Sequence, residues 1–293
     1  MSLLPADFVL PVDKPEGPTS HDVVTAARRS LGIRRVGHTG TLDPFASGLL
    51  LLCVGRATRL AEYVSGLDKT YEAIARLGRS TDTLDKDGVV VDEREGWANL
   101  AEARIEEVLH SFLGAVEQVP PQFSAKKVEG VPMYRRARRG ERVELEPCSV
   151  RIHSLELLSV DLPLLGFRVS CSSGTYVRSL ARDVGEALGV GAHLVSLRRT
   201  SIGDFRVETA IQVDEMADHG RVSEVALDPL SALRHLPTFD VDDESADRLA
   251  HGQAVPIADT GVQGPVAVSH AGGLLAIAES RGGVLRPRKV FVA

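Results

Sequence analysis

The sequence lacks several features that would place it in a specialised class of proteins. Its three cysteines, Cys53, Cys148 and Cys171, stand too far apart for paired metal ligands or a disulfide framework, and its nine histidines follow no metal-ligand pattern. It has no cofactor-binding motif, no internal repeat and no low-complexity tract. No apolar run approaches the roughly 18 residues that span a bilayer. We therefore expect reduced thiols, no metal, no cofactor and no place in a membrane.

The charge and the N-terminal pattern further limit the classes of protein to which this sequence can belong. Residues 1–15 carry acids and prolines where a secretory signal needs a basic start and an apolar core, so a cytoplasmic location is expected. The formal net charge of −6 disfavours a protein that coats nucleic acid indiscriminately, yet a local basic face can still recognise one RNA. A chain of 293 residues, with 43% hydrophobic and 25% charged residues, predicts one large globular domain and a small one.

One stretch, Arg34 to Leu52 (RRVGHTGTLDPFASGLLLL), combines an isolated acid with a stiff turn and an apolar run. Asp43 lies between Gly40 and Gly48 and is followed by Pro44. Glycine lets another molecule approach the backbone closely, and proline pushes the residue before it toward an extended conformation. The apolar run that follows predicts a fully buried strand. Such a turn can present a carboxylate as a nucleophile or a base.

An aspartate followed by a proline is also a common helix start, with the aspartate as N-cap, and local chemistry alone leaves this alternative open. The whole segment GHTGTLDPFASGLL, however, closely resembles the catalytic motif of the bacterial tRNA pseudouridine synthases that modify uridine 55 in the T loop, the TruB family. The resemblance implies that Asp43 is the essential catalytic residue. It also implies that His38 lies against the displaced nucleotide and helps to hold the opened loop.

Two later segments resemble further motifs of the same family. In Lys69-Thr70-Tyr71, the resemblance implies that Tyr71 stacks on the target base and points its hydroxyl into the site. In GTYVRSLARD, it implies that Arg178 pairs with the catalytic carboxylate and that Tyr176 lies against the target nucleotide. Leu197, just before an arginine pair, matches the leucine that closes on the base edge. By chemistry alone these residue types are common in cores and on helix surfaces, so that alternative stays open.

A basic segment near residues 119–147 has no helical or strand periodicity. Its run KKVEGVPMYRRARRGER holds seven basic residues against two acids. Basic charge interleaved with Phe123 and Tyr134 suits an arm that grips phosphates and stacks on bases, although a solvated surface loop is the alternative. The family has a mobile arm here that folds over the tRNA. The predicted RNA-binding residues of the arm are Lys126, Lys127, Arg135, Arg136, Arg138, Arg139 and Arg142.

The remaining pattern predicts an α/β fold in two domains. Residues 1–235 are the expected catalytic domain, with Ser20 as N-cap of one helix and Asn99 as N-cap of a helix that runs to Phe112. Residues 236–293 show short strands and turns, which resemble the PUA-like RNA-binding domain of these synthases. The expected fold is therefore the pseudouridine synthase fold, with a large mixed, mainly antiparallel sheet, plus a small β-rich PUA-like domain.

The function implied by the resemblance is isomerisation of uridine 55 of tRNA to pseudouridine by an aspartate nucleophile acting on a flipped-out base. The tRNA T stem-loop is the expected partner of a monomer that needs no protein partner. A non-catalytic RNA chaperone is one rival, disfavoured by the intact Asp43, Tyr71 and Arg178. A glycosidase is the other; it normally needs two paired carboxylates, and only one acid here stands in a shaped loop.

Overall fold

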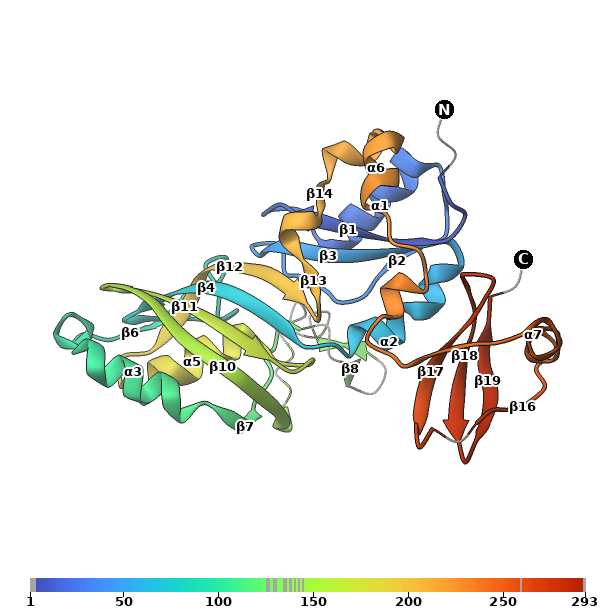
Figure 1. Cartoon of the computed structure of the whole chain (residues 1–293). Coiled ribbons are helices and arrows are strands. Elements are labelled where there is room, and N and C mark those ends of the chain that lie inside the picture. The colour runs from blue at the N-terminus through green and yellow to red at the C-terminus, as the bar shows by residue number, and fades with distance from the viewer. Residues whose placement is uncertain are drawn as a thin grey trace.

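The computed structural model describes residues 4–124, 127, 128, 131–133, 136, 139, 141, 143, 145–258 and 260–291. The strands of its larger sheet are β1 (Phe8–Lys14), β2 (Val36–His38), β3 (Ser47–Val54), β4 (Lys69–Leu77), β7 (Gly114–Gln118), β10 (Cys148–Asp161), β11 (Leu164–Cys171), β12 (Ala192–Ile202), β13 (Phe205–Arg206) and β14 (Ile211–Gln212). These ten strands follow the order β14-β1-β3-β12-β4-β11-β10-β7, with β2 beside β3 and β13 beside β12 (Figure 1). The pairs β1–β14 and β3–β12 are parallel and the others are antiparallel. The predicted mixed, mainly antiparallel sheet is confirmed.

Strand β3 lies in the core on both of its faces, as its unbroken apolar run predicts. Leu50 and Leu52 pack with β1 and with helix α1 (Ser20–Leu31), whereas Leu49 and Leu51 pack on the opposite side. There they meet the 3₁₀ helix η1 (Gly55–Leu60) and helix α2 (Ala61–Ser65). All four leucines are fully buried, and each contributes about 1.5–3 kcal/mol to folding by this burial. The strand is therefore a rigid base for the turn that precedes it.

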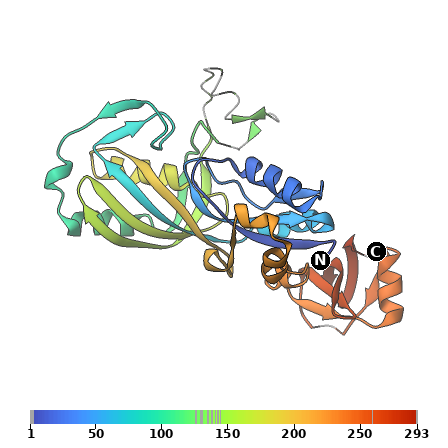
Figure 2. The same cartoon turned by 90° about the horizontal axis from the view of Figure 1, so that it is seen from above.

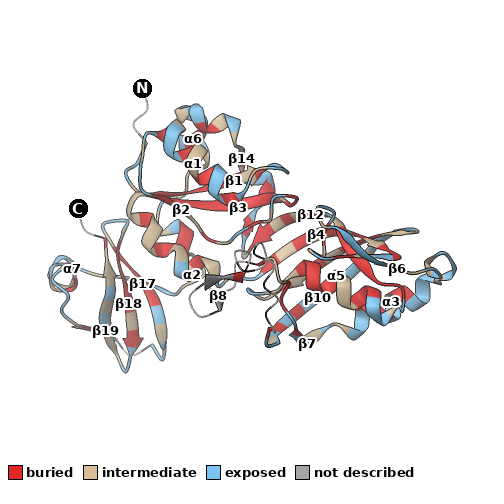
Figure 3. Ribbon diagram, turned by 180° about the vertical axis from the view of Figure 1, so that it is seen from behind, coloured by how far each residue is buried: buried red, intermediate tan, exposed pale blue. Residues whose placement is uncertain are grey.

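The other half of the sheet, β4, β11, β10 and β7, is covered on one face. Helices α3 (Glu102–Ser111) and α5 (Val177–Ala187) pack there (Figure 1). In β4 the side chains of Tyr71, Ala73 and Ala75 face this core, and the alternate residues between them are more exposed. The ribbon of β4 accordingly carries both buried and less buried stretches (Figure 3). Side-chain alternation in the strand thus places Tyr71 on the helix-covered side.

The two predicted helix caps are wrong in position. Thr19, not Ser20, is the N-cap of α1, and it forms a reciprocal capping box with Asp22. Ser20 is turned inward and buried because its hydroxyl bonds the loop at Leu42. Asn99 ends a short 3₁₀ helix, η2 (Trp97–Asn99), and α3 begins only at Glu102 without a side-chain cap.

A second, five-stranded sheet is formed near the C-terminus. It has the order β15-β17-β18-β19-β16 and packs with helix α7 (Figures 1 and 2). The elements are β15 (Thr238–Asp240), α7 (Asp243–Ala250), β16 (Val255–Pro256), β17 (Gly264–His270), β18 (Gly273–Arg281) and β19 (Val284–Val290). The guanidinium carbon of Arg59 lies 4.9 Å from the centroid of the Phe291 ring, and the Lys289 ammonium donates to the Arg59 carbonyl at 2.7 Å. Lys289 also pairs with Glu62, so this sheet is bound directly to η1 and α2.

The remaining elements are shorter. They are β5 (Arg79–Thr81), β6 (Val90–Glu93), β8 (Lys127–Val128), β9 (Val131–Pro132), α6 (His219–Val225), η3 (Val207–Thr209), η4 (Asp214–Ala217) and η5 (Ser231–Leu233). Strands β8 and β9 pair with each other inside the segment for which the sequence shows no periodicity. Among the residues described, no helix is long and apolar enough to cross a membrane.

Candidate active site

A cavity of about 280 Å³ lies where the turns before β3 and the strands β4 and β12 meet the start of α5. It brings together five of the residues that the sequence singles out, although they are far apart in the chain. The predicted site residues that line it are Asp43, Tyr71, Tyr176, Arg178 and Leu197. His38 is not part of the lining, but its neighbour Thr39 is.

Asp43 stands in a tight turn rather than at a helix start. The Ala46 N–H donates to the Asp43 carbonyl at 3.1 Å, and the chain continues directly into β3. The helix-cap alternative for Asp43 is therefore wrong. The Ser20 hydroxyl forms two hydrogen bonds with Leu42, the residue before Asp43. It accepts from the Leu42 N–H at 2.8 Å and donates to the Leu42 carbonyl at 3.1 Å. This side chain fixes the loop from α1.

Gly48, which follows the turn, has a position that only glycine can occupy. Its φ is +104°, and a Cβ atom there would lie 2.2 Å from the backbone oxygen of Arg199. β3 and β12 therefore approach each other closely at this point, which brings the Asp43 turn beside β12.

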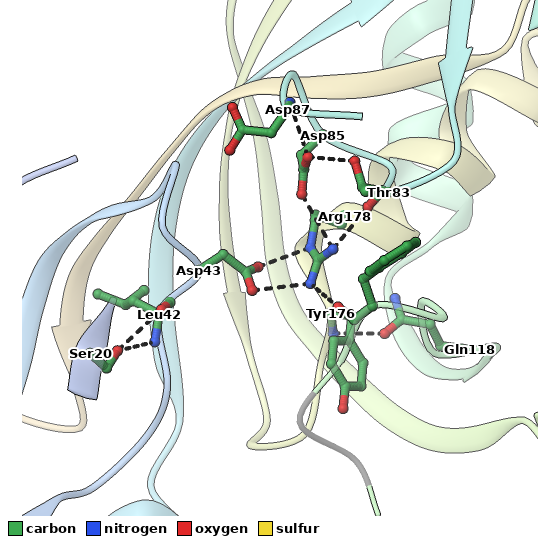
Figure 4. A network of polar contacts seen from close by, with 10 residues as sticks. Ser20, Leu42, Asp43, Thr83, Asp85, Asp87, Gln118, Tyr176 and Arg178 are labelled. Carbon is green, nitrogen blue, oxygen red and sulfur yellow. Dashed lines mark hydrogen bonds and ion pairs between the residues drawn. The ribbon is translucent and has the colours of Figure 1, made fainter. Parts of the chain in front are cut away.

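Arg178 binds the Asp43 carboxylate with two nitrogens. Its Nε lies 2.9 Å from Oδ2 and its Nη2 lies 3.1 Å from Oδ1 (Figure 4). Arg178 is buried, while 34% of the Asp43 side chain is exposed and opens to the cavity. Burial raises the pKa of Asp43, and the charge and hydrogen bonds of Arg178 oppose that rise. The ion pair thus favours the ionised form of a carboxylate that burial would otherwise make easier to protonate.

Asp85 is a second partner of Arg178 that the sequence did not reveal. Its Oδ2 lies 3.3 Å from Nη1 of Arg178, and its Oδ1 accepts from the Thr83 hydroxyl at 2.6 Å and from the Asp87 N–H at 3.2 Å (Figure 4). Burial raises the pKa of Asp85. In the sequence, the acidic segment 81–88 lacks the closing glutamate of an EF-hand calcium loop and so predicts only a turn. One feature could have indicated a second partner: the guanidinium of Arg178 has five N–H donors, and if it is buried it needs more acceptors than the Asp43 carboxylate supplies.

Two of the aromatic and apolar residues that line the cavity also pack in the hydrophobic core. Tyr71 and Leu197 are buried in the core under the helices, so packing and a pocket role coincide for both. The Tyr176 N–H donates to Oε1 of Gln118 at 2.8 Å (Figure 4). Burial raises the pKa of both tyrosines; the charge and a side-chain hydrogen bond of Arg199 oppose the rise for Tyr71.

His38 ends β2 and is half-buried beside the turn. Its Nδ1 accepts from the Gly40 N–H at 3.3 Å, and burial, followed by the charge of Arg199, lowers the pKa of His38. An uncharged ring that accepts from the loop backbone would help to hold the Gly40 turn.

Only part of the predicted arm falls within the described residues. Lys126, Arg135, Arg138 and Arg142 lie outside them, while Lys127 belongs to β8, Arg136 is half-buried and Arg139 is exposed. The root of the segment is tied to α5. There the Phe123 carbonyl accepts from Nη2 of Arg178 at 2.8 Å, and the Val119 carbonyl accepts from the Ser179 hydroxyl at 2.8 Å.

The site presents a carboxylate held by a guanidinium, beside two tyrosines and a leucine. Such a cavity can hold a flat ring by stacking while the carboxylate faces it. Within the described part of the chain, no group of three or more histidine, cysteine, aspartate or glutamate side chains is placed to bind a metal ion.

Solved structures of similar shape come from H/ACA ribonucleoprotein complexes. An archaeal box H/ACA sRNP Nop10–Cbf5 complex superposes with a TM-score of 0.75 at 26% identity and covers 97% of this chain and 86% of the other. An H/ACA RNP bound to a substrate RNA containing 2′-deoxyuridine gives a TM-score of 0.73 at 26% identity, with 98% and 85% covered.

Relatives found by sequence have a higher identity to this chain than these solved structures. A tRNA pseudouridine synthase B of Burkholderia lata is 45% identical, covering 98% of this chain and 90% of its own length, and one of Thermobifida fusca is 45% identical, covering 98% and 99%. The family model of the N-terminal domain of TruB pseudouridylate synthases matches residues 28–177, and that of the tRNA pseudouridylate synthase B C-terminal domain matches residues 178–235. The predicted pseudouridine synthase fold is confirmed, and the chain belongs to the TruB family of tRNA pseudouridine synthases, enzymes of the isomerase class.

Proposed function

We propose that this protein converts uridine 55, in the T loop of tRNA, to pseudouridine, with Asp43 as the nucleophile. The observation that carries the proposal is the two-pronged ion pair between Asp43 and the buried Arg178 at the edge of a cavity lined by Tyr71. A reaction that moves a base from N1 to C5 needs no redox step and no group donor. It needs an ionised carboxylate and a surface that retains the detached base, and this cavity supplies both.

Each side chain around the cavity has its own role in the proposed reaction. Arg178 keeps Asp43 charged against the effect of burial. Tyr71 stacks on the extruded uracil, and a stack of this kind is worth about 1–3 kcal/mol. Tyr176 and Leu197 form the walls against the target nucleotide and the base edge, because both line the cavity. His38, held at the Gly40 turn, lies where it can support the opened RNA loop.

The proposal extends to the rest of the chain. Residues 1–235 are the catalytic domain, and residues 236–293, with their five-stranded sheet, are a PUA-like RNA-binding domain. Lys289 is engaged by Glu62 of α2, so we assign RNA contact to the exposed Arg281 and Arg286. The basic segment near 119–147 is the arm that holds the T stem-loop, and the enzyme acts as a monomer without a protein partner.

The glycosidase rival loses support from the position of Asp85. Although Asp43 and Asp85 share one guanidinium, only Asp43 lines the cavity. The two carboxylates therefore do not flank a substrate bond, as glycoside hydrolysis requires.

The test is tritium release from tRNA transcripts that carry [5-³H]uridine, with pseudouridine mapped by position. The expected result is one tritium released per tRNA and pseudouridine at position 55. A matched transcript with cytidine at position 55 should release none. Release from that transcript at the same rate would overturn the assignment of the position, and binding without any release would favour the RNA chaperone.

A further inference from the structure

Three buried cations surround the active-site cavity in addition to Arg178. Lys14 is at the end of β1, Lys69 begins β4 and Arg199 lies in β12; they are exposed by 0%, 7% and 1%. Lys69 and Arg199 line the cavity itself. Buried lysine and arginine side chains are rare in proteins unless they are paired.

The partners of these cations are neutral. The Lys14 ammonium donates to the carbonyls of Pro15, Pro44 and Ala46 at 2.8, 3.4 and 2.6 Å. The Lys69 ammonium donates to the carbonyls of Ser65 and Leu67.

Arg199 is held in the same manner. It donates through Nε to the Leu49 carbonyl at 2.7 Å and through Nη2 to the Gly40 carbonyl at 3.1 Å. These two contacts bracket the turn that carries Asp43. Within the described residues, no carboxylate forms an ion pair with Lys14, Lys69 or Arg199.

The cavity therefore carries an excess of positive charge. Four cationic side chains stand against Asp43 and Asp85, and both of these carboxylates are already bound to Arg178. Asp22 and Asp68 act on Lys14 and Lys69 only from beyond ion-pair distance. Burial lowers the pKa of Lys14 and of Lys69 to about 8, which shows that their charge is costly in this place. A cleft lined by charge of one sign attracts a ligand of the opposite sign.

The proposed reaction itself produces such an anion. When the bond between C1′ and N1 of uridine breaks with both electrons going to N1, the uracil leaves with a negative charge shared over the ring and its oxygens. Arg199 is well placed to meet it. Arg199 is the direct cross-strand neighbour of Tyr71, the residue proposed to stack on the base, and both line the cavity.

We propose that Arg199, assisted by Lys69, stabilises the uracil anion after the glycosidic bond breaks and retains it for attachment through C5. This inference rests on the proposed function and commits to the route in which Asp43 acts at the ribose. An Asp43 oxygen bonds to C1′ as N1 leaves with the electron pair. C5 of the turned base then attacks C1′ and the carboxylate leaves with its electron pair. The C5 proton passes to solvent and N1 takes a proton from solvent, which gives neutral pseudouridine. A cation beside the departing base lowers the barrier of the first of these steps.

The leaving base can be varied to test this role. Fluorine at C5 withdraws electrons and makes the uracil anion more stable, so cleavage of 5-fluorouridine depends less on a protein cation. We would measure single-turnover loss of the target nucleoside by chromatography of digested T stem-loop RNA that carries uridine or 5-fluorouridine. For Arg199→Met we expect about a 10²-fold slower reaction with uridine and a clearly smaller loss with 5-fluorouridine. Arg199→Lys should recover part of the rate with uridine.

The neighbouring Arg198 provides the matched control. It is paired with Asp13 at 2.7 Å and does not line the cavity, so Arg198→Met should slow neither RNA selectively. Thermal melts would show whether each variant folds. If Arg199→Met does not fold, Lys69→Met should show the same selectivity in weaker form.

Three results would overturn the inference. Equal slowing of both RNAs by the variants would assign Arg199 to holding the Asp43 turn only. Weaker RNA binding with a normal rate at saturation would assign the positive charge to an RNA phosphate. Full activity of Arg199→Met on uridine would exclude any role. Failure of the wild-type protein to convert uridine would instead refute the proposed function, so the two failures are distinguishable.

Discussion

Removing the charge of Arg178 tests how the site keeps Asp43 ionised. In Arg178→Met the Asp43 carboxylate loses two nitrogen partners, at 2.9 and 3.1 Å. Burial already raises the pKa of Asp43, and Arg178 is the main group that opposes the rise. A neighbouring guanidinium lowers the pKa of an aspartate by about 1–3 units. We therefore expect the acid limb of the pH profile of kcat/KM to move upward by a shift of that order.

The loss of rate follows from the size of this shift. Below the limb, each pH unit reduces the ionised fraction tenfold, so kcat/KM should fall by about 10- to 10³-fold in acid and less at alkaline pH. Because 34% of the Asp43 side chain is exposed, solvent screens the pair, and we expect the lower part of the range.

Tritium release measured across pH distinguishes the variants. Arg178→Lys keeps the charge but loses the two-pronged geometry, so its limb should move less. Asp85→Asn removes a negative charge beside Arg178 and should move the limb downward. Arg182→Met is the control, since Arg182 lies one turn further along α5 and pairs with Asp183 at 2.8 Å. A limb at the same pH in every variant, even with lower plateaus, would refute the claim that Arg178 controls the ionisation of Asp43.

Other substitutions probe the parts around this pair. Tyr71→Phe keeps the stacking ring and should bind RNA normally but fail to complete the C5 product; a near-normal rate, with Tyr71→Leu inactive, would leave only stacking. Ser20→Ala removes both hydrogen bonds to Leu42, so we expect the free energy of unfolding to fall by about 1 kcal/mol for each bond and kcat to fall as well; an unchanged kcat would show that the turn holds without the Ser20 hydroxyl. Neutralising four arm arginines should raise KM and flatten the slope of log K against log salt at a nearly normal saturating rate; an unchanged slope would place the RNA contacts outside the arm, and the cluster at Arg28, Arg29, Arg34 and Arg35 would be changed next. The four arm residues to change are Arg135, Arg136, Arg138 and Arg139.

The features that could be predicted from the sequence are those written in contiguous residues. The apolar run after Asp43 predicts a buried strand because any strand so composed must be covered on both faces. The turn is equally local, since Pro44 restricts the backbone around Asp43 and Gly48 allows the positive φ that follows the turn. The pairing of Asp43 with Arg178 came from a motif resemblance, because nothing in the spacing of the two residues brings them together.

The features that could not be predicted depend on contacts between distant segments. Asp85 stands in an acidic turn where several acids are equivalent in the sequence, and only the fold decides which one is buried against Arg178. Arg198 and Arg199 are adjacent in the sequence but make different contacts. Arg198 pairs with Asp13 near the surface, whereas Arg199 donates to the carbonyls that flank the Asp43 turn. Ser20 resembles a cap, but the neighbouring Thr19 fills that position and leaves the Ser20 hydroxyl to the loop.

The most direct test of the central claim is the activity of Asp43→Asn on tRNA labelled with [5-³H]uridine. The amide keeps the shape of the side chain but cannot act as a charged nucleophile, so we expect no tritium release and no pseudouridine at position 55, with RNA binding close to that of the wild type. The mass of the purified variant must show that the amide has not hydrolysed back to aspartate. Pseudouridine formed at position 55 at an appreciable rate by the intact Asp43→Asn protein would contradict the claim that Asp43 performs the chemistry.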